Sequence, residues 1–233
     1  MEATSPGTLP EPQVRAMFDR IAGVYDLINT VMTAGLHHQW RARAADLANV
    51  GLGDRVLDVA TGTGDLAVEM SSRVGSTGEV IGSDFSEEML VRARAKAPNL
   101  QFEWGNALDL PYATATFDAA TVGFAARNFS DLDGGLGEMA RVVKPGGRVV
   151  ILEMTTPQKP PLSTFFSLWF DRVVPVIGKV AGDPDAYEYL PNSVKRFPGP
   201  DGVAASMERA GLKDIRWILT AGGIIALHVG TRV

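Results

Sequence analysis

The chain has 233 residues, 45% of them hydrophobic and 21% charged, which is enough for one large α/β domain or two small ones with a full core. Its net charge of −5 argues against a nucleic-acid-binding surface, because neutralising phosphates requires an excess of Lys and Arg. The lack of cysteine excludes disulfides, thiolate catalysis and thiolate metal sites, and three histidines are few for a dedicated metal centre, so no metal is predicted.

The first 13 residues, MEATSPGTLPEPQ, are acidic and rich in proline. They contain neither a basic segment nor an apolar core, so we interpret them as a disordered tail and not as a signal peptide. No apolar stretch in the sequence approaches the roughly 18 residues of a membrane span. The sequence therefore predicts a cytoplasmic protein.

Residues 14–49 are predicted to be helical. Apolar residues recur there at helical spacing, beginning with Val14, Met17, Phe18, Ile21 and Val24. Gly23 and Gly35 are expected to divide the segment into shorter helices.

Strands and helices alternate from residue 53 onward. Strands are predicted over 55–60, 79–84, 100–104, 117–126 and 148–154, and helices over 66–73, 86–97 and 132–142. Ser86 is the expected N-cap of the helix that it begins. This alternation implies a parallel sheet with right-handed crossovers.

The last third of the chain departs from the alternation. Residues 157–198 are rich in aromatic residues and proline, and we interpret them as an insertion between sheet elements. A helix over 202–210 is followed by two apolar segments, 214–220 and 223–229, at the spacing of an antiparallel hairpin. The predicted fold class is α/β: a Rossmann-like, mostly parallel seven-stranded sheet with helices on both faces and a C-terminal antiparallel hairpin, forming one domain over 14–233.

The segment VLDVATGTGDLA, residues 56–67, is the first candidate site, because its apolar strand ends in a glycine-rich turn. Gly62 and Gly64 let the backbone approach a ligand closely and expose N–H groups. Asp84 ends the second strand, where a carboxylate can accept both hydroxyls of a ribose. The spacing Gly62, Gly64, Ala67 also matches the dinucleotide pattern G-x-G-x-x-A, so both NAD and S-adenosylmethionine fit this turn.

Three local details favour S-adenosylmethionine over NAD. Asp58 and Asp65 flank the turn, where a pyrophosphate would be repelled but a sulfonium and an ammonium group would not. Asn106 follows the third strand, in a position to meet an adenine edge beside apolar side chains. A terminal hairpin is not expected in a dinucleotide-binding domain.

Eight segments together resemble a known family. Five of them resemble the successive motifs of class I S-adenosylmethionine-dependent methyltransferases: VLDVATGTGDL, GSDFSEEML, GNALDLPY, FDAATVGFAARNFSD and EMARVVKPGGRVVILEMTTP. Three more resemble the family that methylates ubiquinone and menaquinone precursors: MFDRIAGVYDLINTVMTAGLHHQWR, YEYLPNSVKRFPG and LTAGGIIALHVG. The resemblance covers roughly residues 14–230, and the flanking motifs are more specific than those around the cofactor.

The resemblance implies a site and a reaction. Thr63 and Asp84 would contact the cofactor together with Gly62 and Gly64, and Asn106 and Ala107 would lie beside the adenine. The implied reaction transfers a methyl group to a ring carbon of a prenylated naphthoquinol, demethylmenaquinol, in the last step of menaquinone biosynthesis. A ring carbon is a poor nucleophile unless a phenolic proton is lost, and a phenol has a pKa near about 10.

Three residues are candidates for catalysis. Arg127 is proposed to favour the phenolate electrostatically, and Tyr25 and Asn128 to orient the oxygen. Each has an alternative: Arg127 could pair with a surface acid such as Asp131, and Tyr25 could be a core residue. His37 and His38 are interpreted as capping or surface residues, and no general base is identified.

The implied substrate, a prenylated naphthoquinol, also indicates which partners the protein has. Its apolar polyprenyl tail needs an apolar channel in the protein and access to a bilayer. The insertion 157–198, with its apolar residues between 165 and 177, and the N-terminal helices 14–50 are expected to cover the substrate pocket and to meet the inner face of the cell membrane transiently. A homodimer is compatible with the sequence, which does not fix the oligomeric state. The alternative functions are methylation of a ubiquinone precursor or another small molecule, and nicotinamide-dependent oxidoreduction.

Overall fold

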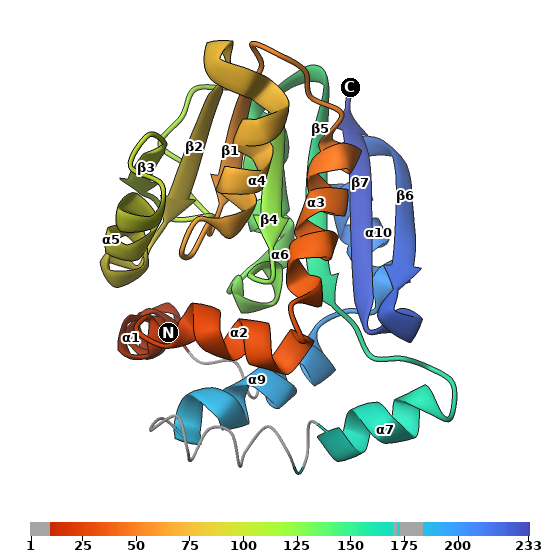
Figure 1. Ribbon diagram of the computed structural model, residues 1–233. Coiled ribbons are helices and arrows are strands. Elements are labelled where there is room, and N and C mark those ends of the chain that lie inside the picture. Colours follow the sequence, from red (N-terminus) through yellow and green to blue (C-terminus); the bar gives the residue numbers. More distant parts are fainter. Residues whose placement is uncertain (1–9, 170–171, 173–183) are drawn as a thin grey trace.

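A seven-stranded sheet with the strand order β3-β2-β1-β4-β5-β7-β6 forms the centre of the computed structural model, which describes residues 10–169, 172 and 184–233 (Figure 1). Strands β1 to β5 pair in parallel, and β7 pairs antiparallel with both β5 and β6. The strands are β1 (Arg55–Val59), β2 (Glu79–Asp84), β3 (Gln101–Trp104), β4 (Phe117–Gly123), β5 (Val143–Met154), β6 (Leu212–Thr220) and β7 (Ile225–Arg232). The predicted fold class, including the C-terminal hairpin, is confirmed.

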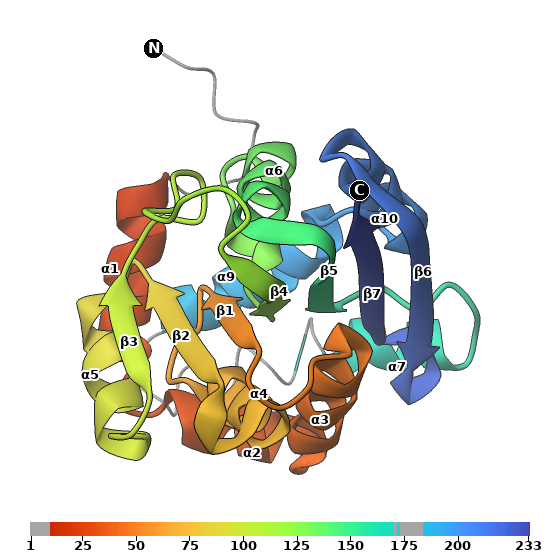
Figure 2. The same cartoon turned by 90° about the horizontal axis from the view of Figure 1, so that it is seen from above.

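Helices cover both faces of the sheet (Figure 2). One face carries α3 (Leu36–Ala48), α4 (Asp65–Val74) and α5 (Glu87–Lys96), and the other carries α6 (Leu132–Val142) and α10 (Pro200–Arg209). Ser86 caps α5 as predicted, because its hydroxyl accepts a hydrogen bond from the Met89 N–H at 3.2 Å.

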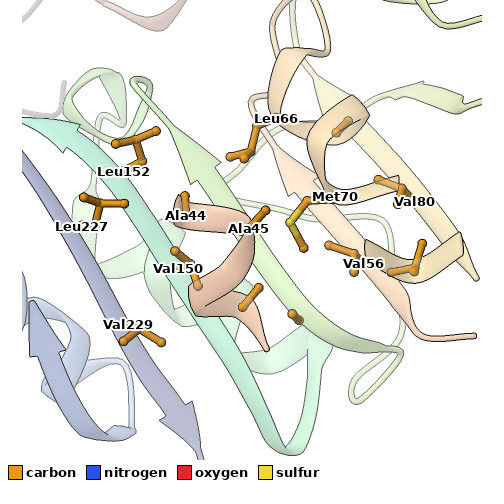
Figure 3. Packing of buried hydrophobic residues seen from close by; sticks show 14 of the residues in the cluster. Ala44, Ala45, Val56, Leu66, Met70, Val80, Val150, Leu152, Leu227 and Val229 are labelled. Carbon is orange, nitrogen blue, oxygen red and sulfur yellow. The ribbon is translucent and has the colours of Figure 1, made fainter. Parts of the chain in front are cut away.

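The core explains why the strands are nearly continuous apolar runs. Val56 of β1 faces the layer of α3 and α4, whereas the next residue, Leu57, faces the layer of α6 and α10. Both side chains are fully buried, as expected for a parallel sheet that is covered on both faces. Small residues let α3 approach closely: Ala44 and Ala45 pack opposite the strands that carry Val150, Leu152, Leu227 and Val229 (Figure 3).

Four further helices gather beyond the carboxyl ends of the parallel strands (Figure 1). They are α1 (Glu11–Ile21), α2 (Tyr25–Thr33), α7 (Leu162–Leu168) and α9 (Pro184–Arg196). A small apolar cluster around Met17, Phe166 and Val194 joins α1, α7 and α9. These helices come from the N-terminal segment and from the predicted insertion, so the two parts of the chain that interrupt the α/β alternation lie together.

Several predicted boundaries are wrong, and the largest error is at the start of β5, which is Val143 and not residue 148. Helix α1 begins at Glu11, so residues 11–13 of the expected disordered tail are helical. Strand β4 ends at Gly123 and not at residue 126, because Phe124 turns the chain with a φ of 60°. Among the residues that the structure describes, no helix is both long and apolar enough to cross a membrane.

Candidate functional site

The glycine turn after β1 opens a cavity at the carboxyl ends of the first four strands. Gly62 has a φ of +58°, and no atom lies within 4 Å of the position that a Cβ would take. Its backbone atoms are therefore directly accessible from the cavity. Gly64 is not in the cavity wall. It is the N-cap of α4, with a φ of +84°, and a Cβ there would lie 2.8 Å from the Phe102 ring, so its role is close packing of helix against strand.

Four carboxyl groups and one guanidinium, that of Arg41, line this cavity, which we call the acidic cavity. The four acids are Glu11, Asp58, Asp65 and Asp84. Burial raises the pKa of Asp58 to about 6, against the hydrogen bonds that it accepts from the Thr61 and Thr121 hydroxyls at 2.6 and 2.7 Å. Such a site favours a cation and repels a pyrophosphate.

Asp84 lies where the sequence predicted a ribose-binding acid. Its carboxylate accepts hydrogen bonds from the Gly62 N–H at 2.8 Å and from the Ser86 N–H at 2.9 Å. Burial raises its pKa to about 6, although both backbone donors lower it. Each oxygen can accept a second hydrogen bond, so Asp84 can hold the glycine turn and a diol together.

The other predicted cofactor residues are brought together at the same cavity. Gly62, Thr63, Asn106 and Ala107 all line it, together with Asp84. The Thr63 hydroxyl also accepts a hydrogen bond from Lys96 Nζ at 3.0 Å, and Lys96 in turn pairs with Asp65 at 2.6 Å. The polar side chains of the turn are therefore held in place by neighbouring helices.

A row of carboxylates on α1 and α2 joins these helices to the loops around the acidic cavity, and Glu11 of this row also lines the cavity. The loops after β1, β2 and β3 each donate one hydrogen bond to this row. The three pairs are Thr63 Oγ1 to Asp26 at 2.6 Å, Ser86 Oγ to Asp19 at 2.5 Å and Asn106 Nδ2 to Glu11 at 2.8 Å. The sequence does not indicate this row, because Glu11 lies in the segment predicted to be a tail and the acids of a helix carry no signal of which loop they meet.

A second cavity, of about 350 Å³, lies under α1, α2, α3, α7 and α9. Its wall is mostly apolar, and we call it the apolar cavity. Phe166 and Trp169 of the predicted aromatic cover line it, as do Met17, Ile28 and Met32. Of the other apolar residues of the predicted cover, Leu168 is 50% exposed, whereas the side chains of Phe165, Phe170, Val173, Val174, Val176 and Ile177 lie outside the described residues.

Arg127 and Asn128 form a polar end of the apolar cavity. The Arg127 guanidinium pairs with Glu153 of β5 at 2.6 Å, and both side chains are almost fully buried. This partner replaces the surface acid Asp131, which instead caps α6. Arg127 Nε and Asn128 Nδ2 are buried and have no hydrogen-bond partner among the described residues, so a ligand oxygen could satisfy them.

The two cavities share part of their walls. The residues that line both are Phe18, Tyr25, Arg41, Phe124 and Asn128. Tyr25 is therefore not simply a core residue. His37 was expected at the surface but is 2% exposed and lines the apolar cavity, because α3 turns its first residues toward α2.

The acidic cavity fits S-adenosylmethionine as the sequence predicted. Its excess of carboxyl groups suits a sulfonium and an ammonium group, and the bare backbone at Gly62 admits close contact. Asp84 has acceptor capacity for a ribose diol. Asn106 and Ala107 lie beside each other in the wall, where an adenine could bind.

Comparison with known proteins gives one consistent match. A model of the ubiE/COQ5 methyltransferase family matches residues 7–232. The chain is 43% identical to the demethylmenaquinone methyltransferase of Thermus thermophilus, over 93% of this chain and 100% of that protein. It is 39% identical to the ubiquinone/menaquinone biosynthesis C-methyltransferase UbiE of Teredinibacter turnerae, over 94% and 91% of the two chains. A solved methyltransferase from Thermotoga maritima shares the fold, with a TM-score of 0.67 and 17% identity over 94% of this chain and 99% of that one.

Proposed function

The chain belongs to the ubiE/COQ5 methyltransferase family, and on that premise we propose that it methylates a ring carbon of demethylmenaquinol to give menaquinol. It is an S-adenosylmethionine-dependent C-methyltransferase that acts in quinone biosynthesis. When bound, S-adenosylmethionine supplies an electrophilic methyl group attached to a sulfonium. The nicotinamide alternative finds no support, because four carboxyl groups line the cavity that would have to hold its pyrophosphate.

The choice of demethylmenaquinol rests on one observation: a relative named for this activity aligns along its whole length with the chain. The apolar cavity supports the choice, since about 350 Å³ lies in the range of ligand pockets and its mostly apolar wall suits a prenylated bicyclic ring. The alternative is a ubiquinone precursor, which the name of the Teredinibacter turnerae relative supports.

We assign the binding of the quinol oxygens to Arg127, Tyr25 and Asn128. Tyr25 and Asn128 lie where the two cavities meet, and the buried donors Arg127 Nε and Asn128 Nδ2 lack partners among the described residues. On the cofactor side, we assign binding to Gly62, Thr63, Asp84, Asn106 and Ala107. Most of the acceleration would come from holding the ring carbon in line with the methyl group.

Methyl transfer to reduced demethylmenaquinone is the direct test. We expect transfer of label from S-adenosyl[methyl-³H]methionine to reduced demethylmenaquinone, and none to the oxidised quinone, because only the quinol can form an electron-rich phenolate ring. Reduced demethylated ubiquinone precursors of equal prenyl length serve as the comparison. Higher kcat/KM with a benzoquinol than with the naphthoquinol would contradict the substrate assignment.

We also propose that the protein lies in the cytoplasm and meets the inner face of the cell membrane transiently through α2. Leu27 and Val31, one turn apart on that helix, are 66% and 64% exposed. Ile28 and Met32 of the same helix line the apolar cavity. An exposed apolar stripe beside an apolar cavity suits delivery of a lipid-soluble substrate.

Vesicle flotation tests this contact. With vesicles of phosphatidylethanolamine and phosphatidylglycerol that contain reduced demethylmenaquinone, we expect the wild type to float and the Leu27→Glu, Val31→Glu double variant to remain below. Leu52→Glu is the matched control, because Leu52 is 81% exposed and precedes β1, at the opposite end of the sheet. Wild-type protein that stays with the dense fraction would contradict the proposal.

A further inference from the structure

The acidic and apolar cavities meet at five residues, and a methyl group that passes from one occupant to the other must cross this junction. Among Phe18, Tyr25, Arg41, Phe124 and Asn128, only Arg41 carries a full charge. Arg127, which the sequence indicated as the catalytic cation, lines the apolar cavity but not the acidic cavity. The junction therefore has a cation of its own that the sequence did not single out.

Arg41 is held at the junction from three sides. Arg41 is only 7% exposed, and its guanidinium lies 5.5 Å from the centre of the Phe124 ring. One terminal nitrogen pairs with Asp65 Oδ2 at 3.2 Å, and the other donates to His37 Nδ1. The rotamer of a long side chain is thereby fixed before a substrate binds, which lowers the entropy cost of using it.

Arg41 differs from Arg127 in how its charge is compensated. Arg127 has Glu153 as a dedicated, buried partner at 2.6 Å. Asp65 instead divides its two oxygens between Arg41, at 3.2 Å, and Lys96, at 2.6 Å. Lys96 also pairs with Asp26, at 2.6 Å, so Arg41 belongs to a network of shared ion pairs and has no carboxylate to itself.

His37 has the properties of a support for Arg41. Burial, and then the charge of Arg41, lower its pKa to about 4, so the imidazole is neutral at neutral pH. A guanidinium can only donate, so Nδ1 is the acceptor and the ring proton sits on Nε2. Nε2 lies 3.2 Å from the Thr30 hydroxyl, which donates to the Asp26 carbonyl at 2.8 Å. Both ring nitrogens are thus occupied, which argues for positioning and against proton abstraction.

We propose that Arg41 is a catalytic residue that binds the ring oxygen next to the methylated carbon and stabilises it as an anion, and that His37 positions Arg41. This inference rests on the proposed function. The quinol oxygen loses its proton to water before transfer and takes one back from water as the ring regains aromaticity. The methylated carbon loses its own proton to water after transfer, and Arg41 keeps its protons throughout. The second ring oxygen, across the naphthalene ring, is left for Arg127.

Substitution at residue 41 tests the catalytic role. We expect Arg41→Gln to lower kcat about 10²- to 10³-fold, as for loss of one oxyanion donor, with KM for the quinol changed far less. Arg41→Lys should recover part of the lost rate, because lysine restores the positive charge but not the paired N–H donors of the guanidinium. Arg43→Gln, an exposed arginine two residues further along α3, is the matched control and should behave as the wild type.

Two measurements without turnover accompany the kinetics. Calorimetry with S-adenosylhomocysteine should give Arg41→Gln a Kd within a few-fold of the wild type. Absorption spectra of 1-naphthol at pH 8, with S-adenosylhomocysteine saturating, should show more naphtholate bound to the wild type than to Arg41→Gln. The naphthol measurement needs no methyl transfer. It therefore still tests Arg41 if the wild type fails to methylate demethylmenaquinol, a result that would contradict only the proposed function.

Substitution at residue 37 tests the positioning role. His37→Asn keeps an acceptor near the place of Nδ1 and should retain most of kcat, whereas His37→Leu should lower kcat without raising KM for S-adenosylmethionine. The proposal is overturned if Arg41→Gln keeps kcat within threefold of the wild type, or if it loses S-adenosylhomocysteine binding and rate in equal proportion. Equal naphtholate spectra for wild type and Arg41→Gln would also overturn it.

Discussion

Replacing Asp84 with Ala is expected to weaken S-adenosylhomocysteine binding by about two to three orders of magnitude, because two charge-assisted hydrogen bonds are worth roughly 3–4 kcal/mol together. The carboxylate has a further task in the free protein, since it accepts the Gly62 and Ser86 N–H groups at 2.8 and 2.9 Å. The variant should therefore also unfold at a lower temperature than the wild type. Isothermal titration calorimetry and thermal unfolding measure the two effects separately.

Two controls belong to this prediction. Asp84→Asn keeps one acceptor oxygen and should fall between the wild type and Asp84→Ala in both measurements. Glu88→Ala, an exposed acid in the first turn of α5, should leave the affinity unchanged. An affinity of Asp84→Ala within threefold of the wild type would show that the acid at the end of β2 does not bind the ribose.

The same carboxylate gives the wild type a pH dependence of binding. Burial raises the pKa of Asp84 to about 6 in the free protein. A ribose diol donates to the charged form, so binding favours the carboxylate, and affinity falls as pH drops through about 6. We expect affinity about tenfold weaker one unit below the pKa than on the plateau above it. Asp84→Asn should lose the part of this pH dependence that Asp84 causes.

Replacing Arg127 with Ala is expected to lower turnover and also to cost about 3–5 kcal/mol of unfolding free energy, because it leaves Glu153 as an unpaired buried charge. The Glu153 side chain is 2% exposed and has little access to water. Affinity for S-adenosylhomocysteine should stay nearly intact, since Arg127 does not line the acidic cavity. Denaturant unfolding, steady-state kinetics and calorimetry measure the three quantities.

A double variant separates the structural from the catalytic role of Arg127. Arg127→Met with Glu153→Gln removes both charges and keeps an acceptor for the Met154 N–H, which Glu153 Oε1 accepts at 2.8 Å. We expect most of the lost stability to return, while turnover stays low because the substrate oxygen still lacks its cation. Recovery of turnover together with stability would assign Arg127 to the fold alone.

Local sequence patterns were sufficient for the fold and for bringing the candidate cofactor residues to one edge of the sheet. The alternation of strand and helix gave the parallel sheet, and the spacing of the terminal apolar segments gave the hairpin. Gly62 and Asp84 follow strands directly, so a parallel sheet brings them to one edge, where the structure has them hydrogen-bonded at 2.8 Å. Hydrophobic periodicity and turn chemistry are properties of neighbouring residues, which is why a single sequence carries them.

The partners of the charged residues were not predictable in the same way. Arg127 was expected to meet a nearby surface acid, but the register of β4 against β5, with Gly123 opposite Leu152, sets Glu153 beside it from 26 residues away. Glu11 was assigned to the tail and meets Asn106, 95 residues further along the chain. Several acidic residues could pair with each basic residue, and spacing along the sequence does not indicate which of them does.

By itself, the sequence determined a methyltransferase-like α/β sheet, a candidate cofactor site at the turn after the first strand, and membership of a quinone-methylating family. These follow from periodicity, from glycine and acid placement within short segments, and from motifs that extend along nearly the whole chain. Only the tertiary structure decided that His37 is buried, that three carboxylates of α1 and α2 meet the loops after β1, β2 and β3, and that Arg41 lies where the two cavities meet. The physical reason is that burial and charge pairing depend on which surfaces the fold brings together, and the walls of both cavities combine residues of α1, α2 and α3 with residues that follow distant strands.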